Sequence, residues 1–154
     1  MTDSADEMKY EVEVAIAILH RDGQFLMQLR DDIPTIAHPG HWGFFGGHIE
    51  LGETPEIALR RELLEEIGYA VTDVTKLGRY PGLKAMRHVF HAPLTVDLTC
   101  LVLREGWDLA LLTPTDIQRG YHYSTRAGQT KPLVEAAQKI LLEFIGLGET
   151  STFK

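Results

Sequence analysis

Three glutamates on one predicted helix are the residues whose types and spacing point most directly to chemistry. Glu62, Glu65 and Glu66 lie within a helix predicted for residues 55–67. Because each residue of an α-helix advances by about 100°, Glu65 lies roughly 60° to one side of Glu62 and Glu66 roughly 40° to the other. Carboxylates this close repel one another unless a cation lies between them, and hard cations such as Mg²⁺ prefer oxygen ligands. The spacing therefore predicts a divalent metal site of the kind that serves phosphate chemistry.

The residues around the glutamates carry the signals of a helix with defined ends. Thr54 is a favourable N-cap, Pro55 suits the first helical position, and Gly68 suits the left-handed position after the last turn. We expect an apolar stripe opposite the glutamates to anchor the helix, and the acidic stripe to face away from the core. The apolar stripe consists of Ile57, Leu64 and Ile67.

The stretch around this helix has the spacing of a known motif. Residues 47–69 read GHIELGETPEIALRRELLEEIGY, which fits the pattern Gly-x5-Glu-x7-Arg-Glu-aliphatic-x-Glu-Glu-x-Gly. The stretch therefore resembles the Nudix box, the signature of the Nudix hydrolase family. The one departure is Tyr69, where the family usually has an aliphatic residue. Because Tyr69 follows the helix, we expect it to pack rather than to take part in chemistry.

The resemblance implies a fold and a reaction. The implied fold is α/β, the Nudix-type α/β/α sandwich with a mixed β-sheet, and the box forms a loop–helix–loop beside that sheet. The implied reaction is hydrolysis of a nucleoside diphosphate linked to another group, such as a nucleoside triphosphate or a nucleotide-sugar. Water attacks a phosphorus of the diphosphate, and Mg²⁺ or Mn²⁺ is the implied cofactor.

The resemblance also implies roles for individual residues. Arg61 and Glu53 are expected to pair with each other and to brace the loop against the helix, as supporting members of the catalytic set. The general base is either Glu62 or Glu105, and the sequence leaves this choice open. Glu105 follows a strand predicted at residues 95–103, and its alternative role is that of a solvated surface carboxylate. The implied metal ligands are the Gly46 carbonyl and the carboxylates of Glu62, Glu65 and Glu66.

The motif leaves the substrate-binding residues undetermined. Arg30, Arg79 and Arg87 are candidates for contacting phosphate, and each is equally consistent with a surface residue of a strand. His48 of the box is another candidate. Phe44 is a candidate for stacking on a base, although core packing is the ordinary role of such an aromatic residue. Many triphosphate-cleaning relatives carry an aromatic residue before the short second helix. The corresponding segment here, residues 109–112, has none, which disfavours an oxidised-purine triphosphate as the substrate.

Composition and charge are those of one globular domain. The chain has 154 residues, of which 44% are hydrophobic and 24% charged. The formal net charge of −7 disfavours binding to nucleic acid or to anionic membranes. A polyphosphate substrate is also negatively charged, and bound metal ions would offset the repulsion between it and the protein. We expect a small-molecule nucleotide as partner, a possible homodimer from the resemblance, and a cytoplasmic protein, since no secretory or membrane-spanning segment is evident.

Patterning along the chain predicts the remaining elements. We expect a flexible tail at residues 1–9, a Nudix hydrolase domain at 10–148 and a second tail at 149–154. A short helix after Thr113 ends at Gly120, an exposed loop covers residues 120–129, and a final amphipathic helix runs from 132 to 145. Cys100 is expected to be a buried, inert thiol within an apolar run. Strands are predicted at residues 10–20, 25–29, 41–47, 71–80, 87–91 and 95–103.

Two other classes of protein fit part of the sequence. A non-catalytic Nudix-like domain that senses a nucleotide is one alternative, but such domains often lose box glutamates and this chain has all of them. An interaction scaffold with an incidental acidic helix is the other, and it would bind no Mg²⁺. Turnover of a nucleotide excludes the first alternative, and Mg²⁺ binding excludes the second.

Overall fold

The computed structural model describes residues 12–152, and the chain divides into two compact units. Of the described residues, the first unit comprises 12–18 together with Phe45–Val102, and the second comprises Leu19–Phe44 and 103–152. Strand β1, Val12–Arg21, contributes residues to both units. The tail predicted for residues 1–9 lies outside the described residues, as do residues 153 and 154.

The first unit is built around the N-terminal part of β1. Its other elements are β4 (Phe45–His48), α2 (Pro55–Ile67), β5 (Thr75–Pro81), β6 (Ala85–Pro93) and the 3-10 turn η1 (Leu98–Cys100). Strand β4 pairs antiparallel with β1, and the register places Ala15 opposite Gly47. Within this unit, β6 is the other neighbour of β1, and it pairs antiparallel with β5.

Strands β1 and β6 run in the same direction. The amide of Val12 donates to the carbonyl of Lys84 at 3.2 Å, immediately before β6 begins. Because this bond joins the start of β1 to the start of β6, the two strands lie side by side along their lengths only if they are parallel. Because the β1–β4 and β5–β6 pairs are antiparallel, the sheet is mixed. The predicted α/β class is therefore confirmed.

Helix α2 has the predicted bounds but buries a different face. The Thr54 side chain caps its start by accepting from the amide of Ile57 at 3.2 Å, and Gly68 ends it in the left-handed conformation with φ of 65°. The predicted anchoring stripe is wrong at two positions, because Ile57 is 54% exposed and Leu64 is 49% exposed. The buried residues of the helix are Ala58, Leu59, Leu63, Glu66 and Ile67.

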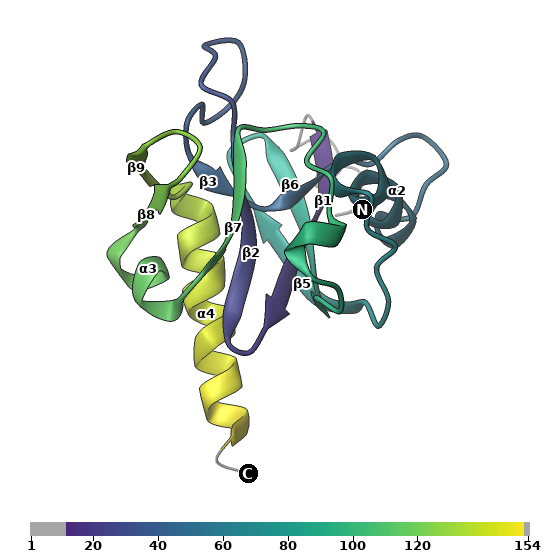
Figure 1. Ribbon diagram of the computed structural model, residues 1–154. Helices are drawn as coiled ribbons and strands as arrows, with labels where there is room; N and C mark the ends of the chain where they lie inside the picture. The colour runs from purple at the N-terminus through teal and green to yellow at the C-terminus, as the bar shows by residue number, and fades with distance from the viewer. Residues whose placement is uncertain (1–11, 153–154) are drawn as a thin grey trace. The chain divides into compact units, whose positions relative to one another are not determined.

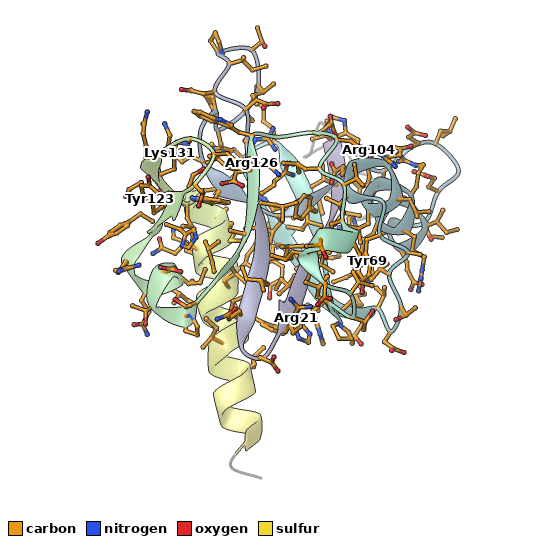
Figure 2. All side chains as sticks on the ribbon, in the orientation of Figure 1. Arg21, Tyr69, Arg104, Tyr123, Arg126 and Lys131 are labelled. Atoms are coloured by element: carbon orange, nitrogen blue, oxygen red, sulfur yellow. The ribbon has the colours of Figure 1, made fainter. Side chains whose placement is uncertain are left out.

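The departure from the family pattern, Tyr69, packs as expected. Its ring is buried directly after α2. Its hydroxyl donates to the Pro93 carbonyl and accepts from the amide of Thr95, both at 3.1 Å. Tyr69 is labelled among the side chains in Figure 2. Tyr69 therefore joins the end of the helix to the segment that follows β6.

The second unit begins with a hairpin between the end of β1 and the next strand. Its elements are β2 (Gln24–Leu29), β3 (Trp42–Gly43), β7 (Asp108–Leu112), α3 (Pro114–Arg119), β8 (Tyr121–Ser124), β9 (Gln129–Pro132) and α4 (Glu135–Thr152), shown in Figure 1. The turn uses Asp22 and Gly23 with φ of 52° and 76°, the backbone signs that match the twist of a hairpin. Strands β3 and β7 both pair antiparallel with β2.

Several segments differ from the sequence predictions. The strand predicted at residues 41–47 is two strands, β3 and β4, separated at Phe44. The loop predicted at 120–129 instead includes β8 and the start of the β8–β9 hairpin, closed by a bond from the Gly128 amide to the Ser124 carbonyl at 2.8 Å. Helix α4 continues through Gly146, where it was predicted to stop, to Thr152.

The segment predicted as a strand at residues 95–103 is irregular. It contains only the 3-10 turn η1, and its Val102 amide donates to the Ile67 carbonyl at the end of α2, at 3.1 Å. Cys100 is exposed, so the prediction of a buried thiol is wrong. Within residues 12–152, no helix combines the length and apolar character needed to cross a bilayer.

Candidate active site

Two box glutamates lie against the backbone of β4 at its two glycines. The Gly46 amide donates to Oε1 of Glu66 at 3.0 Å, and Glu66 is only 5% exposed. A Cβ on Gly47 would lie 2.6 Å from Cδ of Glu62 and 2.7 Å from both of its carboxylate oxygens. The Glu62 carboxylate therefore occupies space that any side chain at Gly47 would fill, and the Gly46 amide binds Glu66 beside it, so the acidic face of α2 can turn toward the sheet.

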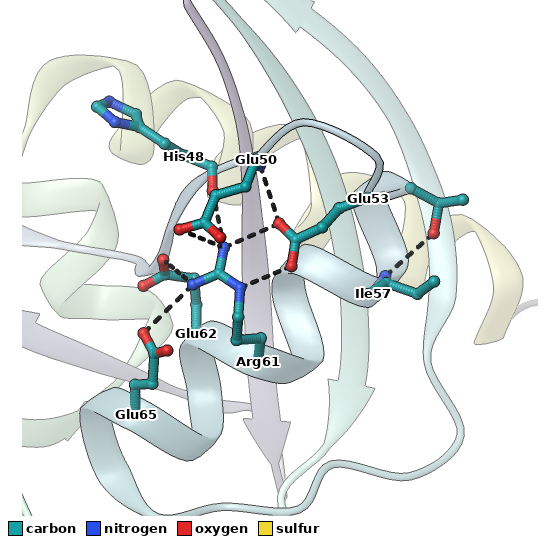
Figure 3. A network of polar contacts seen from close by, with 8 residues as sticks. His48, Glu50, Glu53, Ile57, Arg61, Glu62 and Glu65 are labelled. Atoms are coloured by element: carbon teal, nitrogen blue, oxygen red, sulfur yellow. Dashed lines mark hydrogen bonds and ion pairs between the residues drawn. The ribbon is translucent and has the colours of Figure 1, made fainter.

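Arg61 is the centre of the polar network that joins the box loop to the helix (Figure 3). Its Nε donates to Oε2 of Glu53 at 2.6 Å, and its Nη2 donates to Oε1 of the same carboxylate at 2.9 Å. Such a two-point pair fixes both the distance and the plane of the two groups. The loop carboxylate of Glu53 and the helix guanidinium of Arg61 are thus held in one geometry.

The same guanidinium contacts the candidate metal ligands. Nη1 of Arg61 donates to Oε1 of Glu62 at 2.9 Å and to Oε2 of Glu65 at 3.3 Å. Nη2 donates to the His48 carbonyl at 3.1 Å, which ties the end of β4 to the helix. Glu50 approaches Nη2 at 3.8 Å with a side chain that is 67% exposed. Arg61 therefore binds the same Glu62 carboxylate that lies beside Gly47.

The charges in this network do not cancel. One guanidinium faces the carboxylates of Glu50, Glu53, Glu62 and Glu65, and Glu66 lies on the same helix. The hydrogen bonds from Arg61 lower the pKa of Glu53 to about 2, and the Glu53 carboxylate in turn raises the pKa of Arg61. Glu53 and Arg61 are consequently both ionised at neutral pH, and the site contains more carboxylates than guanidinium groups.

The pairing of Glu53 with Arg61 predicts a pH-dependent contribution to stability. The pKa of Glu53 falls from 4.5 to about 2 on folding, so the folded state binds fewer protons between these values. The contribution is therefore fully present above the unfolded pKa and is lost as the pH falls through the folded pKa. We expect the stability difference between the natural protein and Glu53→Gln, measured by urea unfolding, to shrink as the pH is lowered from 7 to 3. A difference that is constant over this range would contradict the pairing.

The donor set fits a hard divalent cation, although the carboxylates are not gathered into a complete cage. Within the described part of the chain, no three His, Cys, Asp or Glu side chains lie close enough to hold a metal ion by themselves. The available donor atoms are all oxygens, and the carboxylates of Glu62 and Glu65 share the positive charge of Arg61. Mg²⁺ is typically held by one or two carboxylates and keeps several waters, so this set suits Mg²⁺ or Mn²⁺.

The remaining sequence candidates fall into both units. In the first unit, His48 is exposed at the end of β4 and Arg87 is half-buried in β6. Three candidates belong to the second unit. Arg30 donates from Nε to the Ala37 carbonyl at 2.7 Å, Phe44 is half-buried, and Glu105 is exposed with no strand before it.

The sequence analysis missed the part played by the paired glycines. Gly46 was expected to act through its carbonyl and Gly47 was only a fixed position of the motif, whereas the structure places carboxylates directly against both. The available signal was the absence of side chains at two successive strand positions ahead of an acidic helix. At Gly47 the missing Cβ leaves the space that the Glu62 carboxylate occupies, whereas at Gly46 it avoids a clash with the backbone of β1.

Comparison with known proteins identifies a family and several relatives. The model of the NUDIX domain matches residues 9–125. An RNA pyrophosphohydrolase of Aeromonas hydrophila is 33% identical over 122 residues, covering 73% of this chain and 63% of the relative. An RNA pyrophosphohydrolase of Caulobacter vibrioides is 38% identical over 77 residues, covering 50% and 42%. An oxidized purine nucleoside triphosphate hydrolase of Danio rerio is 54% identical over 39 residues, covering 25% of each chain. The chain thus spans less than two thirds of each relative.

Solved structures share the fold. A MutT structure from a study of the Aliivibrio salmonicida and Vibrio cholerae proteins has a TM-score of 0.68 at 21% identity, covering 88% of this chain and 98% of that chain. The solution structure of the E. coli ORF135 protein has a TM-score of 0.65 at 26% identity, covering 92% and 93%.

Proposed function

Because this chain belongs to the Nudix family, we propose that it is a divalent-metal-dependent pyrophosphohydrolase of nucleotides. Its substrate is a nucleoside diphosphate linked to another group, and the bond cleaved is the phosphoric anhydride. The observation that carries the proposal is the arrangement of Glu62 and Glu66 against Gly47 and Gly46, with Arg61 bonded to Glu62. The names of the relatives, two RNA pyrophosphohydrolases and one nucleoside triphosphate hydrolase, support the same reaction class.

The residues that would hold the metal are the carboxylates of Glu62, Glu65 and Glu66 and the carbonyl of Gly46. When bound, a divalent cation offsets charge on phosphate oxygens and lowers the pKa of a coordinated water. The protein fixes the ligands in advance, because the Gly46 amide holds Glu66 and Arg61 holds Glu62. Glu65 is 58% exposed, so its side chain can adjust when the site is filled.

Arg61 and Glu53 act on the reaction through the ligands that they orient. The two-point pair holds the box loop on α2, and the bond from Arg61 to the His48 carbonyl holds the strand that carries the glycines. Partners of this kind typically change metal affinity or activity by roughly 10- to 100-fold when they are removed. Their contribution is to keep the ligand carboxylates in one orientation.

The general base is either Glu62 or Glu105, and substitution of Glu105 tests whether it has this role. We expect Glu105→Gln to lower turnover by less than about tenfold, because a general base typically contributes about a hundredfold or more. Glu105 is exposed in the second unit and is not positioned by a strand. A fall of about a hundredfold with unchanged thermal unfolding would instead assign the base to Glu105.

The proposal is tested by screening the purified protein for hydrolysis. The panel contains nucleoside triphosphates, 8-oxo-dGTP, dinucleoside polyphosphates, nucleotide-sugars and a 5′-triphosphorylated RNA, with phosphate and pyrophosphate as readouts. We expect release from at least one nucleotide in the presence of Mg²⁺ or Mn²⁺ and none after chelation. Absence of hydrolysis across the panel with either metal would overturn the proposed function.

A further inference from the structure

The β8–β9 hairpin of the second unit presents two exposed tyrosines on one face. Tyr121 is 43% exposed and Tyr123 is 56% exposed. Because side chains alternate along a strand, both rings point to the same side of the hairpin, with their Cα atoms roughly 7 Å apart. The residues opposite them on β9, Pro132 and Thr130, share this face and are exposed. We define these four residues as the tyrosine face.

The hairpin is bonded to other elements of the second unit through residues that are not on the tyrosine face. The hydroxyl of Ser124, a fully buried residue, donates to Oδ2 of Asp108 at 2.7 Å. The carbonyl of His122 accepts from the indole of Trp42 at 3.0 Å. Nδ1 of His122 lies 3.0 Å from Oδ2 of Asp116. The two tyrosine rings therefore stand on a fixed support.

Exposed cations accompany the two tyrosines, and the carboxylates that pair with these cations are buried. Residues 117–134 contain no Asp or Glu, although the chain as a whole has a net charge of −7. The side chains of Arg119 and Arg126 are 46% and 60% exposed. Their partners, Asp116 and Asp108, have side chains that are only 8% and 9% exposed. The hairpin region therefore presents guanidinium groups to solvent and keeps the opposing carboxylates in the interior.

Two cations of this region lie over aromatic rings. The guanidinium carbon of Arg119 is 4.9 Å from the centre of the Tyr121 ring. On the other face of the hairpin, Nζ of Lys131 is 5.3 Å from the centre of the Trp107 ring. Aromatic and cationic groups are thus interleaved in and around the hairpin. The side chains of the hairpin that Figure 2 labels are Tyr123, Arg126 and Lys131.

This combination of groups is the one that proteins use to bind single-stranded nucleic acid. Unpaired bases stack on aromatic rings, and cations contact the phosphates that join the nucleotides. A guanidinium plane such as that of Arg119 can also carry a base. A duplex does not offer its bases in this way, because they are already stacked on one another. The tyrosine face and its flanking arginines therefore match a single strand, with rings for the bases and positive charge for the phosphates.

We propose that the tyrosine face binds single-stranded nucleic acid, with a base stacked on Tyr123 and a phosphate held by Arg126. The inference goes beyond the proposed function, because it concerns residues outside the Nudix box and requires no hydrolysis. Every base has a π-face, so the sequence of the strand matters little. RNA and DNA strands share the bases and phosphates that this surface contacts, and the test includes both.

The test is fluorescence anisotropy with fluorescein-labelled oligouridylate and oligothymidylate of about 12 nucleotides, a length within the usual range of site sizes. The label replaces the 5′ phosphate and EDTA is present, so the Nudix box has neither metal nor diphosphate to act on. We expect Tyr123→Ala to weaken binding roughly 5- to 100-fold, the usual loss when a stacking ring is replaced by alanine. Tyr123→Phe should bind as the natural protein does, because it keeps the ring. Arg126→Ala should weaken binding and reduce its salt dependence by about one phosphate contact.

Lys139→Ala is the matched control for charge, because Lys139 is an exposed cation of the same unit that pairs with Glu135 on α4 at 3.2 Å. Its affinity should equal that of the natural protein, and thermal unfolding verifies the fold of every variant. Unchanged affinity in Tyr123→Ala, equally tight binding of a duplex of the same length, or no binding of either strand would overturn the proposal. A changed oligomeric state of free Tyr123→Ala in sedimentation would also overturn it, by assigning the tyrosine face to a second copy of the chain. Inactivity of the metal-loaded protein toward nucleotides would defeat the proposed function and leave this binding standing.

Discussion

We expect Glu66→Gln to abolish nucleotide hydrolysis while the folded structure survives. The Gln side chain keeps an oxygen that can accept from the Gly46 amide, as Oε1 of Glu66 does at 3.0 Å, but it loses the charge that would hold a cation. Since partners one step removed from a metal typically cost roughly 10- to 100-fold, a direct ligand should cost at least about a hundredfold in kcat. Glu62→Gln should behave in the same way, because Glu62 lies beside Gly47 and is bonded to Arg61.

Glu56→Gln is the matched control for both substitutions. Glu56 is on the same helix, but its carboxylate pairs at 3.0 Å with Arg60, and both side chains are largely exposed. Surface pairs of this kind contribute about 0–1 kcal/mol, so turnover and unfolding should be close to those of the natural protein. Full activity in either Glu62→Gln or Glu66→Gln would refute the roles assigned to these residues.

The second large effect is on stability, and it is expected from Gly46→Ala. The φ of Gly46 is 141°, a conformation that L-residues rarely adopt, and an added Cβ would lie 2.1 Å from the Ala15 carbonyl oxygen. The obstacle is the backbone of the neighbouring strand, which cannot move without breaking the β1–β4 pairing. We expect a loss of about 3 kcal/mol or more in the free energy of unfolding, measured in urea.

Gly47→Ala should lower the rate of hydrolysis while changing the free energy of unfolding only slightly. A Cβ there would meet only the flexible end of Glu62, whose Cδ lies at 2.6 Å. The carboxylate can move aside, so we expect the free energy of unfolding to change by about 1 kcal/mol or less. Hydrolysis should nevertheless fall, because Glu62 is displaced from its position beside Arg61. Equal stability losses in the two alanine variants would contradict this account of the paired glycines.

Local signals were sufficient to predict helix α2. Thr54, Pro55 and Gly68 act within one turn of the helix ends, and the structure places both ends at the predicted residues. The box spacing likewise predicted that Glu62, Glu65 and Glu66 share one arc. These features depend on neighbours along the chain, which the sequence displays directly.

The direction in which that arc points was predicted wrongly. Periodicity treats glutamate as outward and leucine as inward, so it placed Leu64 in the core and Glu66 in solvent. In the structure Glu66 is buried and Leu64 is exposed, because the Gly46 amide binds the Glu66 carboxylate and Gly47 leaves room for that of Glu62. Such a choice depends on two segments that meet only after folding, and a single helical pattern carries no trace of it.

The wrong prediction of a strand near Cys100 has a related cause. The apolar run around it suggested a buried strand, but the segment has only a 3-10 turn and one backbone bond to the end of α2. The β8–β9 hairpin was missed because the polar composition of its segment suggested a loop, although two tyrosines precede a turn at Gly128. Strand formation depends on whether a partner strand is available, which neither pattern shows.

The central claim is that the acidic face of α2 holds the divalent cation used for hydrolysis. The most direct measurement is a titration with Mn²⁺, followed by electron paramagnetic resonance of the free ion, on the natural protein, Glu66→Gln and Glu56→Gln. We predict saturable binding by the natural protein and by Glu56→Gln, and at least about tenfold weaker binding by Glu66→Gln. Equal affinity of the natural protein and Glu66→Gln for Mn²⁺ would contradict the claim.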